Sequence, residues 1–155
     1  KDMHHIDKNI RYAMVEKAIE GNGHFMISPI ERDRQGPSYT VDTIRILQRE
    51  FGDEYEFYFI CGTDAVADLP TWKYNRELLS ACHFICASRP GNENEIQKSI
   101  DYFGELGRKK IHFLKTPELA ISSTILRDWI AEKRSVRYLI PDAVIDMIRS
   151  NKLYE

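Results

Sequence analysis

The sequence predicts an α/β domain built on a mainly parallel sheet, and three observations support this fold class. Apolar runs at 55–61, 82–87 and 110–114 have the composition of short buried strands. Segments with apolar residues at helical spacing separate these runs, as in strands joined by crossover helices. The chain has 155 residues, 43% hydrophobic and 30% charged, which suits one globular domain over residues 1–155.

Strands and helices are expected to alternate along the chain. Strands are predicted at 25–29, 55–61, 82–87 and 110–114. Helices are predicted up to Gly21, from Thr40 to Gly52, at 76–80, at 96–103, at 121–132 and from Pro141 onward, with a loop at 31–40. The run 55–61 is apolar at nearly every position, so it is expected to be a central strand covered on both faces.

Two helices have clear apolar stripes. In the helix that begins at Thr40, Val41, Ile44 and Phe51 are expected to face the core. In the last helix the residues expected to point inward are Val144, Ile145 and Ile148.

Charge and composition exclude several classes of protein. The net charge is -2, with acids and bases interspersed, so no basic surface for nucleic acid is predicted. The apolar runs are too short to span a bilayer and no signal peptide is visible, so we expect a cytoplasmic protein without a membrane partner. The odd cysteine count indicates reduced, buried thiols, and no protein-held metal site is predicted. The sequence leaves homo-oligomerisation open.

The residues that follow the strands are the first candidates for binding. In open α/β sheets, ligands bind outside the carboxyl ends of the strands. Gly62 and Asp64 follow one strand, and Arg89 follows the next. Asp64 either caps a short helix or reaches a ribose hydroxyl or a metal-bound phosphate. Arg89 is either a solvated surface residue or a contact for a ligand's charge.

The stretch "ISSTILR", 121–127, has two interpretations. A serine or threonine at a helix start caps free backbone N–H groups, which needs no ligand. Three consecutive hydroxyl residues exceed what one cap requires. With Arg127 on the same helix face, Ser122, Ser123 and Thr124 form a candidate anion site at a helix N-terminus.

Two further stretches have an ordinary and a functional interpretation. Trp72, in "LPTWKYN", is either a core residue or a ring that stacks on a flat ligand. The segment "GPSYT", 36–40, is either a turn that caps the next helix or a set of backbone amides for a carboxylate.

These stretches, taken in order, resemble one family. The motifs "GPSYTVDT", "FICGTDAVADLPTW", "ASRPG", "ISSTILR", "RYLIPDAV" and "IRSNKLYE" are similar to those of the bacterial nicotinate mononucleotide adenylyltransferases, over essentially the whole chain. The serine-threonine-arginine stretch is shared across the wider nucleotidyltransferase superfamily. The combination of "SYT", the "GTD…W" loop and "RYLIP" is much more specific to this family.

The resemblance implies a Rossmann-like nucleotidyltransferase fold. It implies transfer of the adenylyl group of ATP to nicotinate mononucleotide, giving deamido-NAD and pyrophosphate in NAD biosynthesis, with Mg²⁺ assisting. For nicotinate mononucleotide, the implied contacts are Ser38, Tyr39, Thr40, Trp72, Lys73 and Lys1. For ATP, they are Gly62, Asp64, Arg89, Ser122, Ser123, Thr124 and Arg127.

The sequence departs from the family at its start. The family opens with a Gly-rich motif, G-x-F-D-P-x-H-x-G-H, and a second strand, and neither occurs in these 155 residues. We therefore expect the native protein to be longer, with the first strand-helix-strand portion and the catalytic histidines outside this chain. These residues alone are expected to be inactive and poorly stable.

Two rival functions stay open at this point. One is a related adenylyltransferase with another acceptor, such as pantetheine phosphate, which has no aromatic ring for Trp72 to stack on. The other is a non-catalytic nucleotide-binding fragment, which the absent motif favours.

Overall fold

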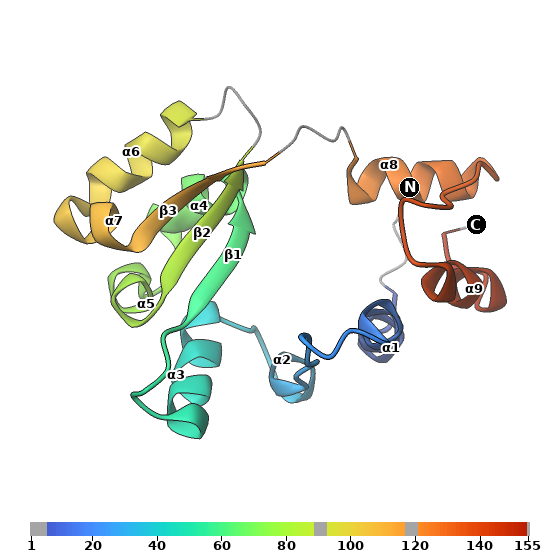
Figure 1. Ribbon diagram of the computed structural model, residues 1–155, viewed down its shortest axis with the longest axis horizontal. Coiled ribbons are helices and arrows are strands. Elements are labelled where there is room, and N and C mark those ends of the chain that lie inside the picture. The colour runs from blue at the N-terminus through green and yellow to red at the C-terminus, as the bar shows by residue number, and fades with distance from the viewer. Residues whose placement is uncertain (1–5, 89–92, 117–120, 155) are drawn as a thin grey trace. The chain divides into compact units, whose positions relative to one another are not determined.

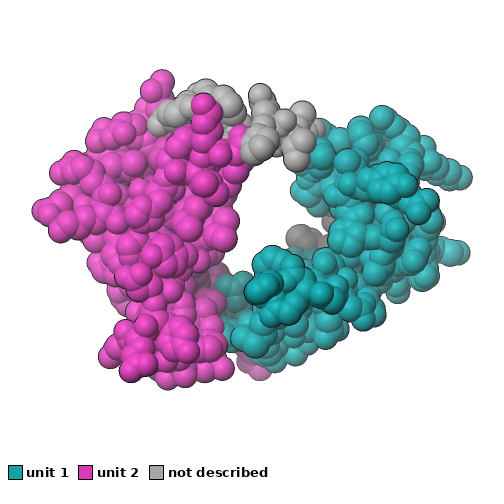
Figure 2. All heavy atoms as spheres, in the orientation of Figure 1, with its two compact units in different colours: residues 1–34, 120–155 teal, residues 35–119 magenta. Residues whose placement is uncertain are grey.

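The computed structural model describes residues 6–88, 93–116 and 121–154 (Figure 1). Two compact units, residues 1–34 with 120–155 and residues 35–119, are treated separately (Figure 2). The elements are α1 (Lys8–Ile19), α2 (Ile30–Asp33), α3 (Thr40–Phe51), β1 (Tyr58–Gly62), α4 (Thr63–Asp68), η1 (Leu69–Thr71), α5 (Asn75–Ala81), β2 (His83–Ser88), α6 (Glu93–Phe103), α7 (Glu105–Lys110), β3 (Ile111–Lys115), α8 (Ser123–Ala131) and α9 (Asp142–Ser150).

The unit of residues 35–119 contains a parallel sheet of three strands in the order β1-β2-β3 (Figure 1). The middle strand β2 pairs with both neighbours, so that Cys86 lies opposite Cys61 on one side and Phe113 on the other. Helices connect successive strands, as parallel pairing requires. The predicted α/β class and the strands at 82–87 and 110–114 are confirmed.

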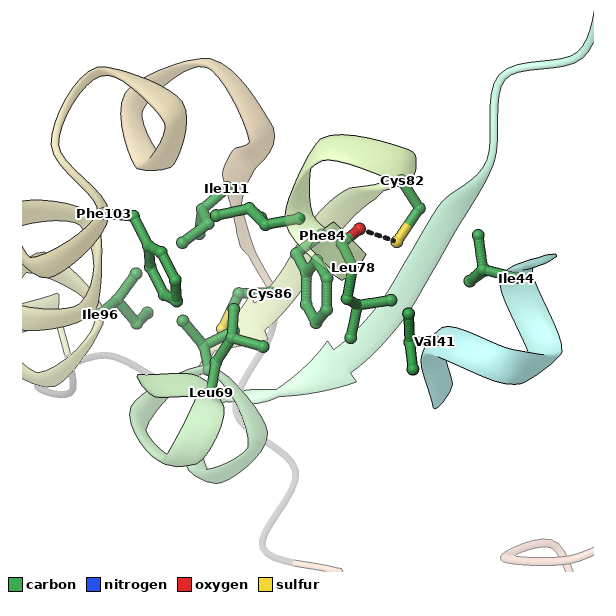
Figure 3. Close-up of a cluster of buried hydrophobic side chains, with 12 residues drawn as sticks. Val41, Ile44, Leu69, Leu78, Cys82, Phe84, Cys86, Ile96, Phe103 and Ile111 are labelled. Atoms are coloured by element: carbon green, nitrogen blue, oxygen red, sulfur yellow. Dashed lines mark hydrogen bonds between the residues drawn. The ribbon is translucent and has the colours of Figure 1, made fainter. Parts of the chain in front are cut away.

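The core lies on one face of this sheet (Figure 3). Phe84 and Cys86 of β2 are 0% exposed, because period-2 alternation turns both of them toward the covering helices. Burial of a side chain as large as that of Phe84 stabilises the fold by roughly 1.5–3 kcal/mol. The helical contributions to the core come from Val41, Ile44, Val66, Leu69, Leu78, Leu79, Ile96 and Phe103.

The prediction for the run 55–61 is partly wrong. A strand forms there, but among the described residues β1 pairs with β2 alone and is an edge strand. Tyr58 and Ile60 are 50% and 71% exposed. Their side chains alternate with those of Phe59 and Cys61, which pack on the core side. An unbroken apolar run places apolar side chains on both faces of a strand. In the described residues, only the face with Phe59 and Cys61 is covered.

The helix predicted from Thr40 is confirmed as α3, and Gly52 ends it with a φ of 83°. That left-handed backbone conformation is one that glycine adopts without a steric penalty. Val41 and Ile44 are buried as expected. Phe51, the last residue of α3, is 37% exposed and makes an edge contact with Tyr55, so it does not belong to the buried core.

Two stretches of this unit are more helical than predicted. Residues 63–71 form α4 and η1, where the sequence indicated a loop with a short helical turn, and residues 105–110 form α7. Gly107 is buried in α7, and a Cβ atom there would lie 2.5 Å from the backbone oxygen of Ile100 in α6. This close approach of two helices is possible because residue 107 has no side chain.

The other unit is helical in its described parts, with α1, α2, α8 and α9. Val144, Ile145 and Ile148 of α9 are buried, as predicted. The strand predicted at 25–29 is wrong. The loop predicted at 31–40 is confirmed over residues 34–39, whereas α2 occupies 31–33 and α3 begins at Thr40. Phe25 and Met26 are 61% and 79% exposed. An isolated extended segment gains no ladder hydrogen bonds, so apolar composition alone does not make a strand.

The three cysteines are free thiols. Cys82 and Cys86 are buried and Cys61 is half-buried. Burial raises the pKa of Cys61 to about 11 and that of Cys82 to about 12, so both stay protonated at neutral pH. The predicted reduced thiols are confirmed. In the described ranges, no helix is both long and apolar enough to cross a membrane.

A row of rings crosses the outer face of the sheet near the strands' amino ends. His83 lies 4.9 Å from Tyr58 and 5.0 Å from His112 between ring centroids. The Lys110 ammonium can only donate, so Nε2 of His83 accepts its hydrogen bond at 3.0 Å. Nδ1 of His83 then carries the hydrogen and donates to Nε2 of His112 at 2.7 Å. This arrangement requires the His83 imidazole to be neutral.

We predict that this row makes the free energy of unfolding fall in mild acid. Burial, Lys110 and His112 lower the pKa of His83 below 6.5, against a smaller opposing effect of Glu56. Below about pH 6.5 the unfolded chain therefore binds more protons than the folded chain, and stability drops as the pH falls. Urea unfolding of His83→Gln between pH 7.5 and 5.5 should show a flatter dependence than the wild type.

The control is His24→Gln, which removes an exposed imidazole elsewhere. Equal pH dependence in the wild type and His83→Gln would contradict the prediction.

The close packing at Gly107 gives a second prediction. Gly107→Ala should lower the free energy of unfolding by about 1–3 kcal/mol, because its methyl group would overlap backbone and not a mobile side chain. Gly23→Ala is the matched control, since a Cβ there meets nothing within 4 Å. Urea denaturation followed by circular dichroism measures both, and equal midpoints for the two variants would show that α6 and α7 tolerate the methyl group.

Candidate functional site

One wall of the candidate site is the N-terminus of α3. Tyr39 precedes the helix in an extended conformation, and it provides no side-chain cap. The first N–H groups of a helix have no partner within the helix, and they carry its positive dipole end. Backbone N–H donors and hydroxyl groups therefore gather at the N-terminus of α3, on Ser38, Tyr39 and Thr40.

The facing wall is made by Trp72 and Lys73, directly after η1. The Trp72 ring packs edge-on against Phe59 and Phe84, with centroids 6.1 and 6.3 Å away. The Lys73 ammonium lies 4.8 Å from the centre of the Tyr39 ring, a cation–π contact that joins the two walls. The core thus supports Trp72 from behind.

Between these walls lies a cavity of about 320 Å³. Its volume is at the lower end of the range of small-molecule sites. The lining combines an indole, a phenol ring, hydroxyl groups and an ammonium with two aliphatic side chains. The lining residues are Ser38, Tyr39, Thr40, Val41, Trp72, Lys73 and Leu78. The structure therefore brings together five residues that the resemblance assigned to the acceptor.

A second cluster lies at the carboxyl end of β1. Gly62 ends the strand and precedes α4, and a Cβ there would meet nothing within 4 Å. Asp64 is exposed in the first turn of α4. Burial raises the pKa of the Cys86 thiol, a hydrogen bond from Thr63 lowers it, and the Asp64 charge raises it. Asp64 thus follows the carboxyl end of β1, at the edge of the sheet where ligands of α/β sheets bind.

The serine-rich stretch lies in the other unit and starts α8. The Ser122 hydroxyl accepts a hydrogen bond from the Ile125 N–H at 3.2 Å, so the predicted cap is present. Arg127 Nη2 donates to Thr124 Oγ1 at 3.4 Å, which shows that these side chains share a helix face. Ser122, Ser123 and Thr124 are exposed at this helix end.

Two assigned residues lie outside the described residues, namely Arg89 and Lys1. The sequence argument also missed some contributors to the cavity. Val41 of α3 lines the cavity, although the sequence argument treated it only as a core residue. Leu78 of α5 also lines it, and the sequence argument did not consider it. Tyr74, which follows the assigned pair, has a φ of 57°, and no sequence signal marks that conformation.

Comparison with known proteins places the chain in the class of nucleotidyltransferases. Residues 2–128 match the cytidylyltransferase-like family. A protein of Moorella thermoacetica named "Probable nicotinate-nucleotide adenylyltransferase" is 43% identical over 155 residues, which are 99% of this chain and 71% of that protein. A Bacillus pumilus protein of the same name is 38% identical over 99% of this chain and 75% of its own length.

The chain belongs to the nicotinate-nucleotide adenylyltransferase family. A solved structure, Plasmodium falciparum nicotinic acid mononucleotide adenylyltransferase complexed with APC, shares the fold. Its TM-score is 0.64 at 22% identity, and the match covers 95% of this chain and 75% of that one.

The cap of α8 gives a prediction that needs no ligand. Ser122→Ala removes the acceptor for the Ile125 N–H and should cost about 0.5–2 kcal/mol of unfolding free energy. Ser122→Asn keeps an acceptor oxygen and should stay close to the wild type. Urea unfolding of the wild type and the two variants measures these free energies. Identical midpoints for Ser122→Ala and the wild type would show that the hydroxyl has no capping role.

Proposed function

We propose that this protein transfers the adenylyl group of ATP to nicotinate mononucleotide, forming deamido-NAD and pyrophosphate. The observation that carries the proposal is the cavity between Trp72 and the N-terminus of α3. A flat aromatic acid needs one aromatic wall and a cluster of donors for its carboxylate. This cavity has both.

The proposed acceptor contacts follow from that geometry. The Trp72 indole stacks on the nicotinate ring. The first N–H groups of α3, near Thr40, and the backbone N–H after Trp72 bind the ring carboxylate. Ser38, Tyr39 and the Lys73 ammonium complete the donor set, and Lys1 is proposed to lie near the acceptor phosphate.

The proposed ATP contacts use different chemistry. Gly62 offers open space beside the backbone for the sugar, and the Asp64 carboxylate accepts from its hydroxyl groups. Arg89, which lies outside the described residues, is proposed to contribute a positive charge to ATP binding. At the start of α8, the hydroxyl groups of Ser122, Ser123 and Thr124 and the Arg127 guanidinium bind the phosphates.

The reaction itself needs no covalent enzyme intermediate. A phosphate oxygen of nicotinate mononucleotide attacks the α-phosphorus of ATP and forms a new P–O–P bond. The bond to the β-phosphate breaks, and pyrophosphate leaves with the electron pair. The protein's task is to align two anions and to neutralise the charge that develops, which explains why the candidate residues are donors and cations.

Mg²⁺ is proposed to enter with the ATP phosphates. No group of three or more His, Cys, Asp or Glu side chains in the described residues is arranged to hold a metal ion. A phosphate-bound Mg²⁺ needs only one or two carboxylates and keeps several waters, so Asp64 fits such an ion. The ion supplies neutralisation of the phosphate charge.

Substitution of Trp72 tests the acceptor assignment. Trp72→Ala should raise the KM for nicotinate mononucleotide on the order of 10-fold, because it removes a stacking surface, with the KM for ATP little changed. Trp72→Phe keeps an aromatic ring that can pack on Phe84. Its KM for nicotinate mononucleotide should lie between those of the wild type and Trp72→Ala. Steady-state kinetics of the enzyme at its native length measures these values. An unchanged acceptor KM in Trp72→Ala would mean that the acceptor is not an aromatic nucleotide.

A further inference from the structure

Arg45, one turn into α3, connects the two helices that flank the cavity. Its Nη1 donates to Oδ1 of Asp42 at 2.8 Å, on α3 itself. Its Nε donates to Oε1 of Glu77 at 2.7 Å, in the first turn of α5. The charge-assisted hydrogen bond to Glu77 joins α3 to α5, and the bond to Asp42 holds the same guanidinium on α3.

The same guanidinium lies over Tyr74, at 5.4 Å from the ring centre. Tyr74 precedes α5 in a left-handed conformation, with a φ of 57° and a ψ of 35°. Such a conformation is costly for a residue with a side chain, and it persists only where surrounding contacts hold it. Arg45 supplies one of those contacts at the point where the chain turns from Trp72 into α5, and Glu77 holds the Arg45 guanidinium.

A second cation continues this series of contacts. The Lys73 ammonium lies 5.5 Å from the Tyr74 ring and 4.8 Å from the Tyr39 ring. The contacts therefore run from Arg45 to Tyr74, from Tyr74 to Lys73 and from Lys73 to Tyr39, which precedes α3. They return to the helix on which they began. Two residues of the segment 72–74 are thus in contact with α3 or the residue before it, Lys73 through Tyr39 and Tyr74 through Arg45.

The exposure of these groups indicates what Arg45 contributes. Its side chain is 36% exposed, and those of Asp42 and Glu77 are 39% and 49% exposed. Ion pairs this exposed add little to folding stability. A displacement of a binding group by about 1 Å, in contrast, can cost on the order of 100-fold in rate. Arg45 therefore matters more for the position of the wall than for the stability of the fold.

We propose that Arg45 is a positioning residue, which holds Trp72 and Lys73 at the distance from the α3 N-terminus that nicotinate mononucleotide requires. This inference rests on the proposed function and adds to it a residue that does not touch the substrate. Because the guanidinium acts as a fork between two carboxylates, lysine replaces it only in part.

The test compares the kinetics of Arg45→Gln and Arg45→Lys with those of the wild type at native length. Arg45→Gln should raise the KM for nicotinate mononucleotide about 10-fold and leave the KM for ATP within roughly 2-fold, with a melting temperature close to that of the wild type. Arg45→Lys should recover part of the loss. Glu77→Gln, which removes the α5 anchor, should reproduce the pattern of Arg45→Gln.

Arg76→Gln is the matched control. Arg76 is the neighbouring arginine on α5, and its guanidinium contacts the rings of Tyr102 and Phe103 away from the cavity. Arg76→Gln removes the same positive charge as Arg45→Gln. It should leave the KM values for nicotinate mononucleotide and ATP unchanged.

The outcomes separate this inference from the function on which it rests. Normal turnover by the wild type, with an unchanged acceptor KM in Arg45→Gln, overturns the positioning role alone. An equal rise of both KM values overturns it too, because the effect would then be a general loss of structure. A wild type without turnover that depends on nicotinate mononucleotide overturns the proposed function and this inference together.

Discussion

The packing of Phe84 is the interaction on which the rest of the unit 35–119 depends. Phe84 is 0% exposed on β2, the strand that is hydrogen-bonded along both edges. Its ring lies 5.2 Å from that of Phe59 and 6.3 Å from that of Trp72. A single buried side chain thus joins the middle of the sheet to a wall of the candidate site. Since interiors are close-packed, a change at Phe84 would be transmitted to the indole.

The contacts that hold the wall of the candidate site become weaker and more polar with distance from this core. Trp72 is held by ring packing, whereas Lys73 and Tyr74 are held by cation–π contacts and Arg45 by exposed ion pairs. Contacts of this kind are individually small, and each can be lost without unfolding the core. These contacts fix the position of Lys73 and Tyr74 in the wall of the cavity and add little to the stability of the fold.

Much of the fold could be predicted from the sequence, because periodicity reports which face of an element is buried. The spacing of Val144, Ile145 and Ile148 identified α9 and its buried face, and Gly52 marked the end of α3. The pattern failed where burial depends on a neighbour in space. Phe25 and Met26 lie in an apolar stretch that forms no strand, and Ile60 is exposed at a sheet edge.

The family could be predicted from motifs, and relatives at 36% to 43% identity confirm it. The cavity gathers five of the residues that those motifs indicated, from Ser38 to Lys73. The network behind it could not be predicted. Arg45, Tyr74 and Glu77 are ordinary residues in the sequence, and only the crossing of α3 and α5 brings them together.

The central claim is that the cavity beside Trp72 selects an aromatic acid as the acceptor of an adenylyl group. Pyrophosphate release from ATP, measured with the protein at its native length, tests it most directly when different acceptors are offered. The account predicts release with nicotinate mononucleotide, much less with the nicotinamide nucleotide that lacks the carboxylate, and none with pantetheine phosphate. Release that is fastest with pantetheine phosphate, or ATP binding without release for any acceptor, would contradict it.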